Sequence, residues 1–345
     1  MPVWNMLRSY IDKHLTLYII SRLLLYTITI IASFTIIFIC LRLMPVNIVE
    51  VLLAAYRSKG QYIHPQALIE LREKLLELFG LKGSPLEQYF SFLKRFITLD
   101  FGPSLLAFPT PVKELVISRL FWTIGLLGIT TIGAWLLGNI CGVVATSIKN
   151  VASKVLQSIA VILYPIPYYI FALILIYAFC YIVPLFPLVG GITVVSPTFT
   201  LHTLIALIRS SILPALSIII VSAFGWWFLS SRALSFNIMK DDFYNYAVIR
   251  GLKPSHILKR YVMKNVLLPQ VTALGLALGN IFCGALLVEV IFAYPGLGYL
   301  LYRAILSGDY STALGILSLS IIGVATATLI LDLIYPLLDP RIRHR

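Results

Sequence analysis

Few residues in this sequence have the types and the spacing that catalysis requires. Asp241 and Asp242 are adjacent carboxylates that could bind a metal or transfer protons, but no second acidic cluster accompanies them. They also stand where negative charge stabilises a helix amino terminus, and we favour that interpretation. The chain contains no G-x-x-x-x-G-K-S/T phosphate loop, no H-E-x-x-H and no G-x-S-x-G signature. We therefore expect no catalytic residue and no nucleotide site in this chain.

Metal binding has equally little support in the sequence. The four cysteines lie in separate apolar runs, without the short spacing or the neighbouring histidines of a zinc or redox site. They predict small apolar side chains at Cys40, Cys141, Cys180 and Cys283. We expect no metal and no cofactor of the chain's own.

The most informative local pattern starts at the acidic pair. Asp241 and Asp242 predict the start of one helix, because acidic residues favour the amino terminus. Gly251 stands where a left-handed helix end favours glycine, and Pro254 predicts the first turn of a second helix. The second helix combines apolar residues at helical spacing with basic ones, namely Ile257, Leu258, Tyr261, Lys253, Lys259, Arg260 and Lys264. This unit is too basic to enter a bilayer, so we expect a cytosolic protein to cover its apolar face.

Composition assigns the chain to a class. Of its 345 residues, 59% are hydrophobic and 12% are charged, with a mean hydropathy of +0.94, whereas a soluble domain carries about 25% charged residues. The apolar residues form runs long enough to cross a bilayer, and strand-like alternation is absent. We predict an all-α integral membrane protein with six transmembrane helices, at 19–41, 121–147, 155–181, 212–231, 266–292 and 311–335.

The distribution of basic residues predicts the orientation. Lys and Arg number 27 against 14 Asp and Glu, which gives a net charge of +13. One side of the membrane receives fifteen of them: Arg8, Lys13, Arg22, Lys149, Lys154, Arg232, Lys240, Arg250, Lys253, Lys259, Arg260, Lys264, Arg341, Arg343 and Arg345. Short loops on the other side hold only Arg209 and Arg303. Because cytoplasmic loops carry the excess of Lys and Arg, both termini should be cytoplasmic, and no nucleic acid is needed to explain the charge.

The long segment after the first span predicts two outer helices. The first is amphipathic, with Leu68, Leu71, Leu75 and Leu78 on one face and Gly80 at its end. The second begins at Ser84, Pro85 and Glu87, which form a capping-box pattern. Its apolar stripe comprises Leu86, Tyr89, Phe90, Leu93 and Phe96. Packing on the outer rim is the favoured interpretation of both stripes, and a docking surface for an external partner is the alternative.

Two acidic residues near the membrane need an explanation. Glu289 is predicted near the outer end of the fifth span and Asp332 near the inner end of the sixth. For Glu289 we favour structural pairing with a neighbouring helix over a place on a substrate path. Two small-xxx-small pairs, Gly138 with Gly142 and Gly275 with Gly279, predict close helix contacts.

At this point the chain resembles a known family. Asn245-Tyr246-Ala247, Gly251 and then Leu268-Pro269 resemble the E-A-A-x-x-x-G coupling motif of ABC importer permeases, with Asn245 in place of the motif's glutamate. The eighteen-residue step from Gly251 to Pro269 is similar to that of the dipeptide, oligopeptide and nickel branch. The usual Gly-Asp after the first span is Val46-Asn47 here. Other matches follow in the family's order: Arg42-Leu43-Met44-Pro45, Gly80-Leu81, Pro85, Gln88-Tyr89, Asp100-Phe101-Gly102, Pro187, Gly190-Gly191, Glu289, Pro295-Gly296-Leu297-Gly298, Asp309-Tyr310, Asp332 and Asp339-Pro340-Arg341.

The resemblance implies a type I ABC importer permease in a prokaryotic cell membrane. Such a chain forms half of a translocation path for peptides or similar oligomers. It implies as partners a second homologous permease, two cytosolic ATPases that bind ATP and Mg, and an extracytoplasmic substrate-binding protein. The implied ATPase-coupling residues are Asn245, Tyr246, Ala247, Gly251 and Pro269, and Glu289 is the candidate for the substrate path. Catalysis would belong to the ATPases, so this chain is not expected to be an enzyme.

The predicted organisation follows the sides of the membrane. Residues 1–41 form the cytoplasmic amino terminus and first span, 42–118 an extracytoplasmic helical loop, 119–335 a five-helix core with the coupling segment 232–265, and 336–345 a basic cytoplasmic tail. Two other functions compete. The same machinery could import oligosaccharides, whereas an ion-coupled secondary transporter should show inverted repeats and midplane acidic or histidine residues, which are absent here. A membrane-embedded enzyme lacks paired catalytic residues in this sequence.

Overall fold

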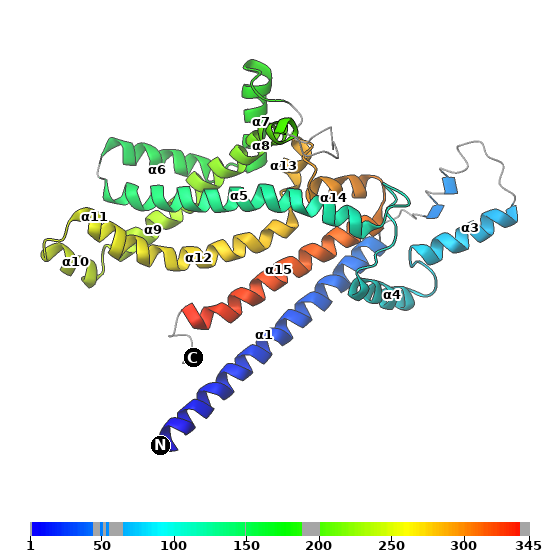
Figure 1. Ribbon diagram of the computed structural model, residues 1–345, viewed down its shortest axis with the longest axis horizontal. Coiled ribbons are helices and arrows are strands. Elements are labelled where there is room, and N and C mark those ends of the chain that lie inside the picture. Colours follow the sequence, from blue (N-terminus) through cyan, green and yellow to red (C-terminus); the bar gives the residue numbers. More distant parts are fainter. Residues whose placement is uncertain are drawn as a thin grey trace. The chain divides into compact units, whose positions relative to one another are not determined.

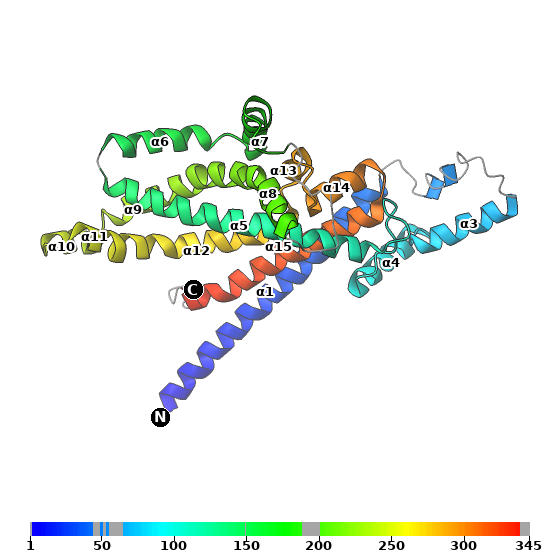
Figure 2. The same ribbon diagram turned by 45° about the horizontal axis from the view of Figure 1, so that its top comes forward.

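The computed structural model describes residues 2–43, 49–50, 53–54, 65–148, 150–187 and 201–338. Within these residues the chain is almost entirely helical, and one isolated bridge pairs Pro103 with Pro111. The chain divides into two compact units, one of residues 122–299 and one that joins residues 1–121 to 300–345. Figures 1 and 2 show the helices of each unit. Val46, Asn47, Gly190, Gly191 and the 339–341 motif lie outside the described residues.

Among the described residues, five helical stretches are long and apolar enough to cross a membrane: Thr16–Cys40, Val112–Ser147, Ile208–Ile238, Pro254–Phe282 and Tyr310–Ile334. A sixth span results if α6 (Val151–Leu163) and α7 (Tyr168–Ile176) with its π-helical extension count as one, although they bend by 102°. Pro165 and Pro167 stand in this break, where each removes a backbone donor. The all-α membrane class is confirmed, and the predicted third span is a bent pair.

The fifth span differs from the predicted 266–292. Its helix starts at α11 (Pro254–Ile257), continues through a π-helical turn into α12 (Lys264–Gly279), and ends in the 3-10 turn Asn280–Cys283. Gly284 then turns the chain at a φ of 70° before α13 (Leu286–Ile291). The predicted end at 292 was wrong because apolar residues continue through this turn. Glu289 therefore lies on a separate short helix.

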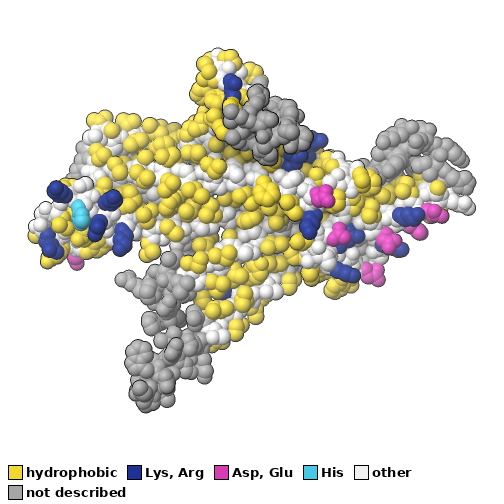
Figure 3. Space-filling view, viewed as in Figure 1, with side chains coloured by type: hydrophobic (Ala, Val, Ile, Leu, Met, Phe, Trp, Pro, Cys, Tyr) yellow, Lys and Arg dark blue, Asp and Glu magenta, His cyan; other side chains and the backbone are white. Residues whose placement is uncertain are grey.

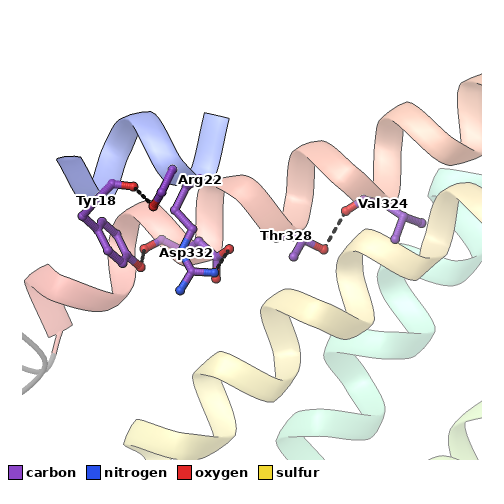
Figure 4. A network of polar contacts seen from close by, with 6 residues as sticks. Tyr18, Arg22, Val324, Thr328 and Asp332 are labelled. Carbon is purple, nitrogen blue, oxygen red and sulfur yellow. Dashed lines mark hydrogen bonds and ion pairs between the residues drawn. The ribbon is translucent and has the colours of Figure 1, made fainter. Parts of the chain in front are cut away.

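Helices α1 (Pro2–Arg42) and α15 (Tyr310–Leu338) pair along their length (Figures 1 and 2). Figure 4 shows Arg22 and Asp332 pointing toward each other, with 3.3 Å between Nη1 and Oδ2. The Tyr18 hydroxyl donates to the Asp332 carbonyl at 2.8 Å, and the Arg22 guanidinium lies 5.0 Å from the Tyr18 ring centroid. Opposite charges satisfy one another here, so Asp332 is accommodated by helix pairing.

The second unit brings α5 (Val112–Ser147) close to the span formed by α8 (Leu201–Ser222), a π-helical turn and α9 (Phe228–Ile238). A methyl group on Gly138 would lie 2.5 Å from the Ala223 carbonyl oxygen, and one on Gly142 would lie 2.6 Å from the Phe228 carbonyl oxygen. The close approach predicted from this glycine pair is confirmed. The same argument for Gly275 and Gly279 stays a prediction.

The two helices predicted after the first span are confirmed as α3 (Pro65–Leu78) and α4 (Pro85–Thr98), while their place outside the membrane stays a prediction. Gly80 follows α3 at a φ of 67°, the left-handed conformation that glycine tolerates best. Ser84 and Glu87 form the expected capping box at the start of α4. Arg95 of α4 donates to the carbonyls of Leu78 and Glu77 at 2.9 and 3.1 Å, so α4 caps the end of α3.

Asp309 fastens the segment before α5 to the start of α15. Its side chain is fully buried. Oδ2 accepts hydrogen bonds from the Ser104 hydroxyl at 2.6 Å, from the Leu105 and Leu106 amides at 2.8 and 3.1 Å, and from the Thr312 hydroxyl at 2.7 Å. Oδ1 accepts from the Thr312 amide at 3.0 Å, as an N-cap does. All five partners are donors, so both oxygens must be acceptors.

This geometry predicts that Asp309→Asn destabilises the protein and that Asp309→Ala destabilises it more. An amide has one oxygen, so its NH2 group would face at least one buried amide donor in either orientation. We expect Asn to cost about 1 to 3 kcal/mol, which is the cost of one unmade bond to a buried donor, and Ala to cost more because it leaves all five donors without this acceptor. Thermal unfolding of the purified protein in lipid measures the difference. An Asn variant that unfolds at the wild-type temperature would contradict the five-donor arrangement.

Candidate functional site

Helix α10 (Asp242–Ile249), Gly251 and α11 form a helix-glycine-helix unit, as the sequence predicts. Asp241 occupies the N-cap position of α10, although its side chain makes no capping hydrogen bond. Gly251 has a φ of 69°, and its amide donates to the Val248 carbonyl, while the Leu252 amide donates to Ala247. This pair of bonds is a Schellman motif, which ends a helix with a left-handed residue. A methyl group on Gly251 would meet no atom within 4 Å.

One face of α10 packs against other helices of its own unit, residues 122–299. Ala247 is 2% exposed. Tyr244 packs against a buried cluster of Val143, Val262 and Val266, which come from α5, the π-helical turn after α11, and α12. Helix α10 is therefore packed against two of the membrane-spanning stretches, Val112–Ser147 and Pro254–Phe282. Helix α9 extends to Ile238 and α11 starts at Pro254, so the connection between these helices is shorter than the predicted segment 232–265.

The opposite face of α10 is apolar and exposed. Tyr246, Val248 and Ile249 are 63, 50 and 82% exposed, and Asn245 is exposed beside them. The Arg250 guanidinium lies 5.7 Å from the Tyr246 ring centroid. Figure 3 shows Lys and Arg side chains gathered around α10 and α11, and the exposed basic residues there are Arg250, Lys253, Lys259, Arg260 and Lys264. An apolar patch with a basic rim is typical of a protein-binding surface.

Pro269 lies apart from this patch. It stands inside α12, fifteen residues beyond the start of α11, which is about 22 Å along a helix. The next residue, Gln270, is 1% exposed. Its side-chain Nε2 donates to the Ser230 hydroxyl at 2.8 Å, and its backbone carbonyl accepts from Trp135 Nε1 at 3.0 Å. These bonds tie α12 to α5 and α9. Asn245, Tyr246, Ala247 and Gly251 thus lie in the helix-glycine-helix unit, whereas Pro269 lies on α12, the helix that leads away from it.

Glu289 holds the amino terminus of α14 (Leu297–Leu306). Its side chain is fully buried. Oε2 accepts from the Gly298 and Tyr299 amides at 2.7 and 3.1 Å, and Oε1 accepts from the Thr123 hydroxyl at 3.0 Å. Thr123 Oγ1 in turn accepts from the Leu297 amide at 2.7 Å. Three helix-start donors therefore find protein acceptors, and the carboxylate lies at the positive end of the helix dipole.

Two glycines make room for this carboxylate. A methyl group on Gly296 would collide with the Glu289 carboxylate, and one on Gly298 would lie 2.7 Å from the Leu286 Cα atom and 3.0 Å from Glu289 Oε2. The Pro295-Gly296-Leu297-Gly298 motif thus has a physical reason within this chain. The sequence singled out Glu289 and these glycines. It gave no sign that Thr123 completes the arrangement, because a threonine in an apolar helix is common.

The arrangement predicts that Glu289→Gln is tolerated and Glu289→Ala is not. The glutamine oxygen can accept from the two amides while its NH2 donates to Thr123 Oγ1, so mainly the charge contribution of about 0.3 to 1 kcal/mol is lost. Alanine leaves three donors without this acceptor, the Gly298 and Tyr299 amides and the Thr123 hydroxyl, at about 1 to 3 kcal/mol for each buried donor that stays unpaired. Thermal stability and transport by the assembled complex in liposomes test both variants. A Gln variant that assembles normally yet transports nothing would assign Glu289 to the substrate path.

Comparison with known proteins identifies the family that the chain matches. Residues 115–344 match the family model described as binding-protein-dependent transport system inner membrane component. The chain is 30% identical to the oligopeptide transport system permease protein AppB of Bacillus subtilis (strain 168) over 276 residues, which cover 79% of this chain and 85% of that protein. It is also 30% identical to the dipeptide transport system permease protein DppB of the same organism, with the same coverage of both chains.

A third relative extends the match over more of the chain. The probable peptide ABC transporter permease protein y4tP of Sinorhizobium fredii is 28% identical over 312 residues, which cover 89% of this chain and 93% of that protein. Residues 115–344 of the family match include the helix-glycine-helix unit, Pro269 and Glu289. The chain therefore belongs to the family of binding-protein-dependent transport system inner membrane components, and it is a multi-pass inner-membrane permease of an ABC importer.

Proposed function

We propose that this permease forms half of the translocation path of an ATP-driven importer for peptides or similar oligomers. The names of the relatives support this substrate class, since they are oligopeptide, dipeptide and peptide permeases. The complete importer would contain a second homologous permease, two cytosolic ATPases and an extracytoplasmic substrate-binding protein. ATP and Mg would bind to the ATPases, and this chain would not be an enzyme.

The exposed apolar face of α10 is the observation that carries the coupling mechanism. Tyr246 and Ile249 project from a helix whose other face is fixed to the membrane-spanning helices, and a soluble partner is needed to remove them from water. An ATPase that covers this face could push α10 as a rigid body. Helix α11 continues through a π-helical turn into α12, so such a push would reach the spans without an intervening flexible loop. Coupling would depend on the shape of the unit rather than on Asn245.

Gly251→Val should disconnect ATP hydrolysis from transport while leaving the membrane spans in place. A Cβ atom at this position meets no neighbouring atom, and a β-branched residue held at positive φ strains the backbone by about 1 to 2 kcal/mol. Gly251→Asn is the matched control, since asparagine tolerates this conformation better than other side chains. We expect Val to abolish, and Asn to retain, the stimulation of ATP turnover by peptide-loaded binding protein in lipid.

Two further results define this test. Asn245→Ala removes a side chain from an exposed helix surface and should change the stimulation by less than about twofold, because surface substitutions cost little. Full assembly of the Val variant with wild-type stimulation would exclude the helix-glycine-helix unit as the coupling element. If no peptide stimulates the wild-type complex whereas an oligosaccharide does, the coupling scheme survives and the peptide substrate class fails.

The orientation is also a proposal, based on the uneven distribution of Lys and Arg. Lys82 before α4 and Lys253 before α11 are both exposed, so cysteines there should be reachable. In a variant without the four native cysteines, an impermeant thiol reagent added outside intact cells should label Lys82→Cys and spare Lys253→Cys until the membrane is opened. Labelling of both from outside contradicts the proposed orientation.

A further inference from the structure

Helix α4 packs against the side of α1 through aromatic rings. The Phe34 ring centroid lies 5.9 Å from that of Phe92 and 4.1 Å from that of Phe96. Phe38 lies 5.3 Å from Tyr89 and 5.7 Å from Phe92, measured in the same way. The hydroxyls of Thr35 and Tyr89 are hydrogen-bonded at 2.7 Å. The two helices are therefore in contact over at least one turn of α1.

These contacts fix how far α4 lies along the membrane-spanning stretch. The apolar span of α1 is Thr16–Cys40, so Phe34 and Phe38 belong to it. With a rise of about 1.5 Å per residue, they lie about 9 and 3 Å inside its Cys40 end. Helix α4 is consequently beside the last turns of the span rather than beyond them. At that depth an uncovered side chain meets lipid unless another protein excludes it.

The surface of α4 divides into three stripes. The first, which includes Phe92 and Phe96, packs on α1. The second, called the lipid stripe here, consists of Leu86, Phe90, Leu93 and Ile97, at helical spacings of four, three and four residues. The third is polar and exposed, with Glu87, Lys94 and Thr98. The lipid stripe adjoins the α1-packing stripe, while the polar stripe lies farther around the helix.

The lipid stripe consists of large apolar side chains that are mostly exposed, and their contact with water would be unfavourable. Leu86, Phe90 and Ile97 are 70, 65 and 79% exposed. Apolar residues of α1 at the same depth are also exposed, including Ile36 at 61% and Ile39 at 49%. Exposed apolar side chains therefore occur on both α1 and α4 at this depth. Two sets of contacts fix the rotation of α4 about its axis. Arg95 is hydrogen-bonded to the end of α3, and aromatic rings of α4 pack against Phe34 and Phe38 of α1.

We propose that α4 is a membrane-interfacial helix whose lipid stripe enters the acyl-chain boundary of the leaflet at the Cys40 end of α1. The polar stripe then faces the headgroups and water, where Lys94 can reach lipid phosphates. This arrangement anchors the segment between α1 and α5 to the bilayer surface. A face reserved for a soluble protein would more naturally project beyond the span than lie beside its last turns.

Fluorescence quenching by brominated lipid tests the proposal on the complete importer. Single cysteines replace Leu86, Phe90 and Ile97 in the lipid stripe, and Lys94 and Thr98 in the polar stripe, in a chain without its native cysteines. Each carries an environment-sensitive dye, and the complex is placed in phosphatidylglycerol–phosphatidylcholine nanodiscs brominated near the carbonyl end of the acyl chains. We expect quenching at Leu86, Phe90 and Ile97 at least about threefold stronger than at Lys94 and Thr98, because an interfacial helix presents only one face to the chains.

The other outcomes reject a lipid-facing helix. Equal quenching at all five positions excludes an oriented interfacial helix. Weak quenching throughout, together with a change of the Phe90 signal when loaded binding protein is added, assigns the stripe to a protein interface. Stimulation of ATP turnover in each labelled complex shows whether it is assembled. A second variant guards against dye effects: Phe90→Glu should lower transport in lipid more than Lys94→Glu does, and equal losses would contradict the proposal.

Discussion

Helix amino termini that are buried away from water need acceptors, and this requirement governs how the chain after its fifth span is arranged. Two buried carboxylates meet it. Glu289 and Thr123 satisfy the first amides of α14, while Asp309 satisfies the start of α15 and two amides of the segment before α5. In a chain that lies largely in lipid, an unpaired amide is costly because no water replaces the missing partner. The helix breaks in this region are therefore fixed structures with specific partners.

Breaks in the other helices follow the same constraint. The bend between α6 and α7 lies against the π-helical turn Ala223–Trp227, where a methyl group on Gly225 would be 3.3 Å from the Tyr164 Cα atom. The rings of Tyr164 and Trp226 stack at 6.4 Å. Two irregular stretches of backbone thus pack against each other, which limits how much irregular backbone meets lipid.

Rigid connections give the proposed coupling its physical basis. Helix α10 is held by Tyr244 and Ala247 on one side and ends in hydrogen-bonded left-handed geometry at Gly251. The chain then enters the span as a continuous helical stretch, which is bound to α5 and α9 at Gln270. A displacement of α10 would therefore reach the membrane-spanning helices as a movement of packed elements. In the unit of residues 1–121 and 300–345, Arg95 joins α4 to α3, and Asp309 joins the segment before α5 to the start of α15.

The sequence by itself determined the all-α membrane class, the capping box of α4 and the left-handed turn at Gly251, because each depends on local spacing and composition. The six predicted spans are reached within the described residues only when the bent pair α6 and α7 counts as one. The sequence also singled out Glu289 and the nearby glycines. Only the tertiary structure showed that Glu289 lies on a separate helix, that Thr123 and the start of α14 are its partners, and that Asp309 joins segments 205 residues apart. Contacts between distant residues leave no mark on local hydropathy. The sequence likewise predicted that α4 is amphipathic. Its position along α1 is given only by the aromatic rings of α4 that pack on Phe34 and Phe38.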